Sequence, residues 1–436
     1  MHIALCIPTY ENSKVVEDFL INCAPYYMEC GIDIYFYDSS REDATEKVVK
    51  KFMTSGRIHY IAIPEYVEPD EKTFMIFQGY GITGEYDFIW LSGDGVQYPK
   101  EGVQFILSKL DTKYDLVTLN SRNRNGVIQA EIICDINNYF QTCAVQLTLY
   151  GAAILNSHTV FRDVNWDYYK GICLKASIAG FSHISFIFHR ILELEQFCGL
   201  NLNLGKHRYR LSTKKKTSSW YQNCFSTWVY KWTEVIESLP DYYENKMAIV
   251  MSQGKSLLGN VDSFKRLKLD GVYSYKVFRK YIEYWNKVTE ISLFRLFLIS
   301  IEPKFFIRVT GKIGFLLNTG NLKRFCRAHA EIYILGAGRI GEIYGEYFIK
   351  NNIPFQGFFV LPGKAANNEM LEHPVFEFQE NHYLLQNTGI VLALGPDDTR
   401  IGLENLSGLV PPKDIFNVPS LRRDIAFESG YKALNI

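Results

Sequence analysis

The sequence has no excess of charge of either sign, because its 436 residues include 47 Lys and Arg and 47 Asp and Glu. This balance removes any global electrostatic argument for binding nucleic acid or an acidic partner. No run of about 18 uncharged apolar residues occurs, so a membrane-spanning helix is not predicted. A strand is expected from Ile3 onward, which leaves no room for the charged and apolar regions of a signal peptide. We therefore expect a protein that is not exported.

Paired cysteine motifs are also missing. The nine cysteines are scattered, none forms a C-x-x-C pair, and several lie inside apolar runs. An odd, scattered set is typical of reduced thiols rather than of a disulfide framework. The cysteines therefore predict a cytosolic protein with reduced thiols in its core.

Apolar residues are plentiful at 47%, and aromatic residues make up 15%. A chain of this length exceeds the usual size of one core and predicts two or three domains. Strand patterns alternate with helical patterns over the first part of the chain, which favours a doubly wound α/β sheet. Residues 139–204 are apolar and read as mostly helical, long helical patterns run from 218 to 322, and a new α/β unit begins at Glu331. We expect domains at 1–217, 218–330 and 331–436.

Two turns near the N-terminus carry residues that cap helices. Asn12 or Ser13 precedes an apolar stripe of helical spacing, and either side chain is expected to cap that helix. The residues from Ser40 to Asp43 have the spacing of a capping box and precede a second helical stripe. Each turn therefore predicts a change from strand to helix.

Three apolar runs in this region end in polar or acidic residues: IALCIPTYEN from Ile3, IYFYDSS from Ile34 and FIWLSGDG from Phe88. If these runs are neighbouring buried strands, their carboxyl ends lie at one edge of the sheet, where α/β proteins bind ligands. The residues expected together at this edge are Pro8, Tyr10, Asp38 and Asp94.

Asp94 lies between Gly93 and Gly95 at the end of the third run. An acid in this position can present its carboxylate to a cleft, while the small neighbour lets a ligand approach the backbone. Mg²⁺ and Mn²⁺ take one or two protein carboxylates and leave their other positions to water and phosphate oxygens. Asp94 is therefore the candidate metal ligand.

Together the three motifs resemble family 2 glycosyltransferases of the GT-A fold, over about residues 1–210. The matching features are the I-P-T-Y turn, an acid followed by two serines, and an acidic motif after a later strand. The resemblance implies a sugar-nucleotide donor whose diphosphate is bound through Mn²⁺ or Mg²⁺. It implies that Pro8, Tyr10 and Glu11 line the base and ribose pocket and that Asp38 contacts the nucleobase edge.

The same resemblance implies further donor contacts. Lys72 falls where family members place polar or basic contacts, and Gly93 belongs to the metal motif. The family motif is usually acid-x-acid, whereas this chain has Ser92 in the first position, so that Asp94 alone remains. His207 stands where many members have a further metal ligand, and the basic run 206–216 is expected to close over the diphosphate.

A transferase of this kind needs a general base that takes the proton from the acceptor hydroxyl. The family commonly has an Asp about 90 residues beyond the metal motif, where this chain has Gly180-Phe181-Ser182-His183. His183 is the first choice because imidazole titrates near neutral pH. Its apolar neighbours are equally typical of a hydrogen-bonded core histidine. Asp163 and Asp167 are the carboxylate alternatives.

The second α/β unit begins with a strand, Gly336-x-Gly338-x-x-Gly341 and a helix, a context that can hold a phosphate. No acid follows at the end of the next strand, near Leu361, so NAD binding is disfavoured. Residues 331–410 resemble the small nucleotide-binding domain of bacterial sugar O-acyltransferases, which implies a Rossmann-like domain for nucleotide binding or association. The acyltransferase's β-helix repeats are absent, and acyl transfer is not expected.

We therefore expect a bacterial-type, cytoplasmic, inverting glycosyltransferase that moves a sugar from a UDP-linked donor to a hydroxyl of a surface glycan such as capsule or cell-wall polysaccharide. The acceptor is expected to be a glycan or lipid-linked glycan, with no nucleic acid partner. Self-association and peripheral contact with the inner membrane face stay open, because residues 291–317 form a basic amphipathic pattern that suits either core packing or a membrane surface. The alternatives are an NAD-linked sugar-modifying oxidoreductase and a non-catalytic nucleotide-sugar-binding scaffold.

Overall fold

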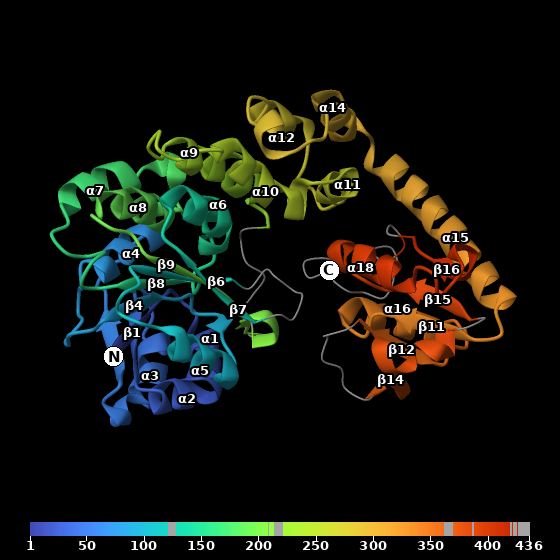
Figure 1. The fold of residues 1–436 in the computed structure, drawn as a ribbon. Coiled ribbons are helices and arrows are strands. Elements are labelled where there is room, and N and C mark those ends of the chain that lie inside the picture. The colour runs from blue at the N-terminus through green and yellow to red at the C-terminus, as the bar shows by residue number, and fades with distance from the viewer. Residues whose placement is uncertain are drawn as a thin grey trace. The chain divides into compact units, whose positions relative to one another are not determined.

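A computed structural model describes residues 1–120, 128–207, 209–212, 221–361, 369–385 and 388–418, together with Leu421 and Ile425. The chain divides into two compact units, Met1–Ile301 and Glu302–Ile436. Residues 221–301 belong to the first unit, and the long helix that begins at Lys304 belongs to the second. Each unit is described by itself (Figure 1).

The first unit contains an eight-stranded sheet with the order β3-β2-β1-β4-β8-β6-β9-β7. The strands are β1 (Ile3–Thr9), β2 (Ile32–Asp38), β3 (Ile58–Ala62), β4 (Phe88–Leu91), β6 (Leu116–Asn120), β7 (Gln129–Ile133), β8 (Ala153–Asn156) and β9 (Gly199–Asn203). A small two-stranded sheet pairs β5 (Val96–Gln97) with β10 (Arg210–Leu211).

The predicted α/β class is confirmed, but the large sheet is mixed rather than fully parallel. The strands β3, β2, β1 and β4 are parallel neighbours, as the alternating pattern predicts. The strand β8 runs antiparallel to both β4 and β6, and β7 runs antiparallel to β9. The prediction that residues 139–204 are mostly helical is wrong for β8 and β9, because short apolar runs do not distinguish a buried strand from a buried helix.

Helices cover both faces of this sheet (Figure 1). The helices are α1 (Ser13–Asn22), α2 (Ala24–Glu29), α3 (Ala44–Lys50), α4 (Pro69–Phe77), α5 (Lys100–Lys109), α6 (Ile136–Leu147), α7 (Trp166–Cys173) and α8 (Ser182–Arg190). Alternate residues of β1 enter different cores: Leu5 and Ile7 join the core beneath α1, whereas Ala4 and Cys6 join the core beneath α4 and α8. Burial on both faces explains why β1 is a continuous apolar run.

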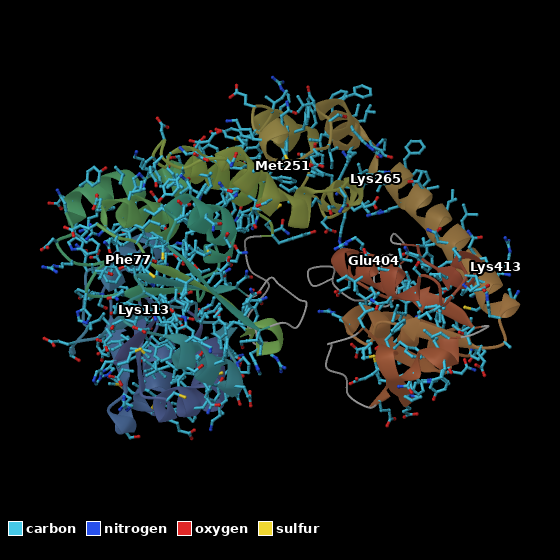
Figure 2. All side chains as sticks on the ribbon, in the orientation of Figure 1. Phe77, Lys113, Met251, Lys265, Glu404 and Lys413 are labelled. Carbon is cyan, nitrogen blue, oxygen red and sulfur yellow. The ribbon has the colours of Figure 1, made fainter. Side chains whose placement is uncertain are left out.

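Aromatic side chains fill the core between α4 and α8. The Phe77 and Phe186 rings lie 5.0 Å apart, and Trp166 stacks on Phe186 at 5.7 Å with an interplanar angle of 9°. Figure 2 shows Phe77 among the side chains of this unit. Because this core ties α8 to α4, the segment around His183 is held at a fixed place relative to the sheet.

The rest of the first unit is helical, as predicted. Its helices are α9 (Trp232–Glu237), α10 (Lys246–Leu258), α11 (Val261–Leu269), α12 (Tyr275–Lys280), α13 (Trp285–Val288) and α14 (Leu293–Ile301), with a π-helical turn at Ser226–Lys231. In the described part of the chain, no helix is both long enough and apolar enough to cross a membrane.

The second unit begins with α15 (Lys304–Ala328) and contains a separate sheet with the order β13-β14-β12-β11-β15-β16. The other elements are β11 (Ile332–Leu335), α16 (Arg339–Lys350), β12 (Gly357–Val360), β13 (Glu369–Met370), β14 (His373–Glu377), α17 (Phe378–Asn381), β15 (Gly389–Leu392), α18 (Pro396–Leu406) and β16 (Ile415–Phe416). Only β13 runs antiparallel to its neighbour among the described strands of this sheet.

Helix α15 has two contrasting faces. Leu322 is fully buried in the core of the second unit. Phe305, Phe306 and Leu317 are 68%, 56% and 63% exposed. Within the basic amphipathic pattern at 291–317, the residues Leu296, Ile299 and Ile307 are buried. Core packing therefore explains only part of that pattern.

Packing accounts for two of the three glycines in the Gly336-x-Gly338-x-x-Gly341 motif. A Cβ on Gly341 would lie 1.8 Å from the Gly336 carbonyl oxygen, and a Cβ on Gly336 would lie 2.4 Å from the Ala393 oxygen. Gly336 also has φ of +126°, which L side chains rarely adopt. These two glycines let α16 approach the sheet closely, whether or not a ligand binds.

Candidate active site

The ends of β1, β2 and β4 meet at one edge of the first sheet. Thr9 and Asp38 are register partners at the ends of β1 and β2. The Ser92 N–H donates to the Cys6 carbonyl at 2.9 Å and thereby holds the turn after β4 beside β1. The strand ends therefore converge as the sequence predicts.

Asp94 lies in this turn and faces the turn after β1. Its Oδ2 accepts a hydrogen bond from Asn12 Nδ2 at 2.6 Å and a longer one from Thr9 Oγ1 at 3.4 Å. Asn12 occupies the N-cap position of α1 as predicted, but its side chain does not cap the helix. The Asn12 side chain is turned toward Asp94 instead, where its amide donates to a buried carboxylate. A buried carboxylate without a donor would be costly, whereas water can satisfy the exposed first turn of a helix.

Asp38 is almost fully buried, with 2% of its surface exposed. It accepts hydrogen bonds from the Ser40 N–H at 2.9 Å, from the Ser40 hydroxyl and from the Tyr60 hydroxyl at 2.9 Å. The Ser40 oxygen in turn accepts the Glu11 N–H at 2.6 Å. This network links the turn after β1 to the turn after β2.

The predicted capping box at 40–43 is wrong. Helix α3 begins at Ala44, and the Asp43 side chain makes no capping hydrogen bond. Asp43 pairs instead with Lys47 at 2.7 Å on the surface. The Ser40 hydroxyl cannot cap α3 because Asp38 and Glu11 already bind it.

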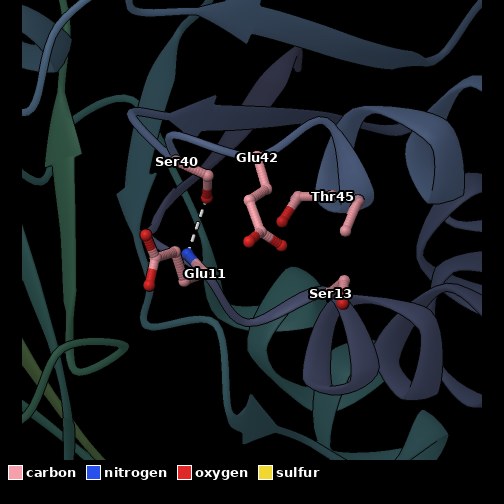
Figure 3. A pocket seen from close by; sticks show the side chains of 6 residues that line it. Glu11, Ser13, Ser40, Glu42 and Thr45 are labelled. Carbon is pink, nitrogen blue, oxygen red and sulfur yellow. Dashed lines mark hydrogen bonds between the residues drawn. The ribbon is translucent and has the colours of Figure 1, made fainter.

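A pocket of about 180 Å³ opens between the turn after β1 and the turn after β2. It is lined by Glu11, Ser13, Ser40, Glu42, Ala44 and Thr45 (Figure 3). The Thr45 hydroxyl is buried and has no hydrogen-bond partner among the described residues. A buried hydroxyl without a partner is costly, so its position in the pocket lining favours a polar ligand there.

Pro8 and Tyr10 lie at the base of the turn after β1. Pro8 is partly buried and pairs in register with Tyr37. The Tyr10 ring packs edge-to-face on Tyr66, with ring centroids 4.9 Å apart. Both residues shape the turn, whereas Glu11 and Ser40 line the pocket itself.

Lys72 lies beneath the same edge. Helix α4 begins at Pro69, so that Lys72 lies in its first turn. Its Nζ donates to the Thr9 carbonyl at 2.6 Å, and 3% of the residue is exposed. Burial lowers the pKa of Lys72 to about 8, although the charges of Asp38 and Asp94 raise it. The ammonium group therefore lies in the field of both carboxylates.

Gly93 lets the turn after β4 approach the segment that precedes β8. A Cβ at Gly93 would lie 3.3 Å from the Cβ of Tyr150. The Tyr150 hydroxyl forms a hydrogen bond of 3.2 Å with Thr73 Oγ1 on α4, and its ring centroid lies 4.7 Å from that of His183. Tyr150 thus separates the Gly93–Asp94 turn from His183.

His183 is closed off from solvent, with 1% of its surface exposed. Its Nε2 contacts the Leu147 carbonyl at 3.0 Å, and because a carbonyl only accepts, Nε2 carries the proton. Nδ1 is buried and has no partner among the described residues. Burial lowers the pKa of His183, so the ring is neutral at neutral pH. A neutral ring is able to act as a base. The ring is buried, however, so an acceptor does not reach it directly.

Asp70 ties the start of α8 to α4. Its carboxylate accepts hydrogen bonds from the Gly180 N–H at 2.6 Å and from the Ser182 hydroxyl at 2.6 Å. Because Asp70 and Lys72 belong to one helix, the segment around His183 is positioned by the same element that carries the buried lysine.

The two carboxylates predicted as alternative bases lie on the surface. Asp163 and Asp167 are both exposed, and Asp163 pairs with its neighbour Arg162 at 3.4 Å.

Strand β10 brings part of the basic run 206–216 beside the site. The Ser212 N–H donates to the Gly95 carbonyl at 2.9 Å, next to Asp94. His207 lies in a 3-10 turn whose main chain packs on α5: a Cβ at Gly102 would lie 2.7 Å from the His207 oxygen. Arg208 and residues 213–216 lie outside the described residues.

The donor set suits a hard cation that keeps most of its ligands from water and phosphate. Asp94 supplies one carboxylate, and a hydroxyl and an amide lie next to it. Within the described ranges, no three or more His, Cys, Asp and Glu side chains gather as a metal cage. An Mg²⁺ or Mn²⁺ ion here would therefore depend on the oxygens of a bound diphosphate.

Sequence reasoning missed several residues of this edge. Asn12 and Asp70 carry the signals of helix termini, and only the fold shows that one binds Asp94 and the other binds the start of α8. Thr45 reads as an ordinary helical residue. Tyr150 belongs to a glycine-containing run that is apparent in the sequence, but its contacts with Gly93 and His183 join distant segments.

The chain matches no model of a known protein family, and no curated protein matches its sequence. Similar solved structures include TarS residues 1–349 from S. aureus, with 13% identity, a TM-score of 0.38, and coverage of 64% of this chain and 83% of that one. A mannosyltransferase from Pyrobaculum calidifontis, in complex with GDP-Man and Mn²⁺, has 10% identity, a TM-score of 0.38 and coverage of 69% and 86%.

A third similar structure is glucosyl-3-phosphoglycerate synthase from Mycobacterium tuberculosis in complex with Mn²⁺, UDP and glucosyl-3-phosphoglycerate. It has 11% identity, a TM-score of 0.36 and coverage of 55% of this chain and 81% of that one. Because these identities and scores are low, the function is inferred from this chain's own residues and topology.

Proposed function

We propose that the first unit is an inverting glycosyltransferase of the GT-A type that uses a nucleoside diphosphate sugar, with UDP as the nucleotide. The observation that carries this proposal is the meeting of Asp38, Lys72 and Asp94 around Thr9, beside a pocket with a buried, unpartnered Thr45 hydroxyl. One edge thus offers a recess of polar side chains, a buried cation and a carboxylate, which are the groups that a nucleoside and a diphosphate need.

The donor would lie across this edge. The nucleoside occupies the pocket between the turns after β1 and β2, where Glu11 and Thr45 offer polar contacts. The diphosphate extends toward Lys72 and Asp94, because the Lys72 ammonium stabilises the charge that grows on the leaving group. A bound Mn²⁺ or Mg²⁺, held by Asp94 and, as we also propose, by His207, would supply further positive charge at the diphosphate.

The acceptor hydroxyl attacks the anomeric carbon from the face opposite the diphosphate, and a general base removes its proton. We propose that the acceptor is a hydroxyl of a glycan or lipid-linked glycan. We propose His183 as the base, because its unprotonated Nδ1 is buried without a partner among the described residues and its ring packs on Tyr150, which in turn lies against Gly93. A shift of the Tyr150 ring would be needed to open Nδ1 to an acceptor.

Donor binding tests the proposed function. In a thermal-shift screen of UDP-, GDP-, CDP- and dTDP-sugars with and without Mn²⁺, we expect UDP-sugars with Mn²⁺ to raise the melting temperature most. At a ligand concentration about 100 times Kd, the stabilisation is about 2.7 kcal/mol, which corresponds to about 4 °C for a unit of this size. Binding of NAD without any sugar nucleotide would favour the oxidoreductase alternative instead.

The His183→Asn variant tests the base. We expect kcat to fall by about 10²- to 10⁴-fold, while the affinity for the donor stays within twofold, because only proton removal is lost. Burial lowers the His183 pKa, so the acid limb of the wild-type kcat/KM profile should lie below the usual histidine range and vanish in the variant. If kcat and the acid limb are unchanged while Asp163→Asn or Asp167→Asn is inactive, the base is one of these exposed carboxylates.

A further inference from the structure

Two cysteines lie in direct contact at the edge of the first sheet. The Sγ atoms of Cys134 and Cys198 are 3.7 Å apart. Cys134 follows β7 and Cys198 precedes β9, which are antiparallel strands with Ile133 opposite Gly199. The register therefore places Cys134 directly opposite Cys198. The Cα atoms of directly opposite residues in antiparallel strands lie about 4.5–5.5 Å apart, within the range that a disulfide spans.

The main chain on both sides of this pair is fixed. The Cys198 N–H donates to Asp115 Oδ2 at 2.8 Å, and the Cys198 carbonyl accepts the Asp115 N–H at 2.8 Å. On the other side, Asp135 caps α6 by accepting the Asn138 N–H at 2.7 Å. Because neither backbone is free to swing away, the contact of the two sulfurs is a lasting property of the fold.

This pair also differs from five of the other seven cysteines in its access to solvent. Cys134 is exposed and Cys198 is partly exposed. The fully buried cysteines are Cys6, Cys23, Cys143, Cys173 and Cys224. Desolvation and, after it, the hydrogen-bonding contact with the Cys134 sulfur raise the pKa of Cys198 to about 11. An oxidant therefore meets Cys134 first, with Cys198 in place to react next.

We propose that Cys134 and Cys198 are a redox-sensitive pair that forms a reversible disulfide with a peroxide as oxidant. The Cys134 sulfur attacks the O–O bond of hydrogen peroxide and becomes a sulfenic acid, and one water leaves. The Cys198 sulfur then attacks the sulfenic sulfur, the S–S bond forms, and the sulfenic oxygen leaves as a second water. The two sulfurs give up two electrons and the peroxide takes both. A small thiol reverses the reaction by exchange.

The disulfide would act on the part of the chain that carries the acceptor side of the proposed site. It closes the loop from 134 to 198, which contains α6, β8, α7 and α8 and thus Tyr150 and His183. It also fixes β7, which is the edge strand and pairs with β9. Closure of so long a loop removes conformational freedom from the unfolded chain and stabilises the fold. The proposal does not depend on the glycosyltransferase function.

The test is limited peroxide oxidation of the full chain. We expect the protein to lose about 2 Da, the mass of the two thiol hydrogens, and peptide mapping without reductant to find 134 joined to 198. The melting temperature should rise by about 3–6 °C and return after treatment with dithiothreitol. Both Cys134→Ser and Cys198→Ser should abolish the cross-link.

The matched control is Cys30→Ser, because Cys30 is also partly exposed. This variant should cross-link 134 to 198 as the wild type does. The proposal is overturned if peptide mapping finds Cys134 oxidised to the sulfinic acid while Cys198 stays a free thiol, or if Cys30 reacts and the pair does not. Mapping is carried out on the wild-type chain, so a folding defect in a serine variant does not affect this outcome.

Discussion

Asp94→Asn is expected to lower the rate of sugar transfer by about 10²- to 10³-fold, the range found when one group that stabilises developing charge is removed. The side chain keeps its size and can still accept the Asn12 amide hydrogen, so the fold should survive. The negative charge that a divalent cation needs is lost. The extra thermal stabilisation that Mn²⁺ gives in the presence of UDP should therefore disappear, while UDP alone still binds through the pocket at Glu11 and Thr45.

The matched control is Asp43→Asn. Asp43 is an exposed acid near the same edge of the sheet, and it pairs with Lys47 on the surface. Its loss should leave transfer and the effect of Mn²⁺ within twofold of the wild type, because surface ion pairs contribute about 0–1 kcal/mol. Transfer that persists unchanged in Asp94→Asn would remove Asp94 from the site.

The kcat/KM for the sugar-nucleotide donor is expected to fall as the pH rises through about 8, because Lys72 then loses its charge. The ammonium form is the one that attracts a diphosphate, and kcat/KM reports the pKa of the free enzyme. Above this pH, kcat/KM should fall by about tenfold per pH unit until another group limits the rate. Lys72→Arg keeps the charge over the whole range and should lack the alkaline fall. Lys72→Met should be impaired at every pH.

Unfolding does not explain this alkaline loss. The Lys72 pKa is lowered on folding, so between about 8 and the usual lysine value of 10.5 the unfolded chain holds more protons than the folded one. Stability from this group therefore rises with pH in that window, in the direction opposite to the expected loss of donor use. An alkaline fall that is identical in the wild type and in Lys72→Arg would show that another group carries it.

The parallel half of the first sheet could be predicted from the sequence, because β1, β2 and β4 are buried on both faces. Continuous apolar runs such as β1 and β4 end in polar residues, and the alternation of strand and helix gives their order. The antiparallel half could not be predicted in the same way. Strand β8 has four residues and β9 has five, and short apolar runs of this kind fit a helix equally well.

Within the candidate site, the residues at strand ends were predictable and the residues that join separate elements were not. Asp38 and Asp94 follow buried strands, and parallel packing alone brings them to one edge. The Asn12 amide, the Asp70 carboxylate and the Thr45 hydroxyl depend on how helices approach that edge. The local sequence correctly predicts that Asn12 and Asp70 lie at helix termini and that Thr45 lies in a helix. It does not reveal which distant groups these side chains contact.

For His183, the sequence predicts the position but not the role. The sequence leaves open whether it is a base or a core histidine, and the structure gives it features of both: a buried ring packed on Tyr150 and an unpartnered Nδ1. The choice depends on whether Tyr150 moves when a donor binds. No pattern in one sequence contains that information.

The most direct test of the central claim is a crystal structure of the chain with UDP and Mn²⁺, with anomalous scattering used to locate the metal. We expect the uracil and ribose in the pocket between the turns after β1 and β2, the diphosphate beside Lys72, and the manganese peak on the Asp94 carboxylate. A nucleotide that occupies only the second unit, or a manganese peak remote from Asp94, would contradict the account.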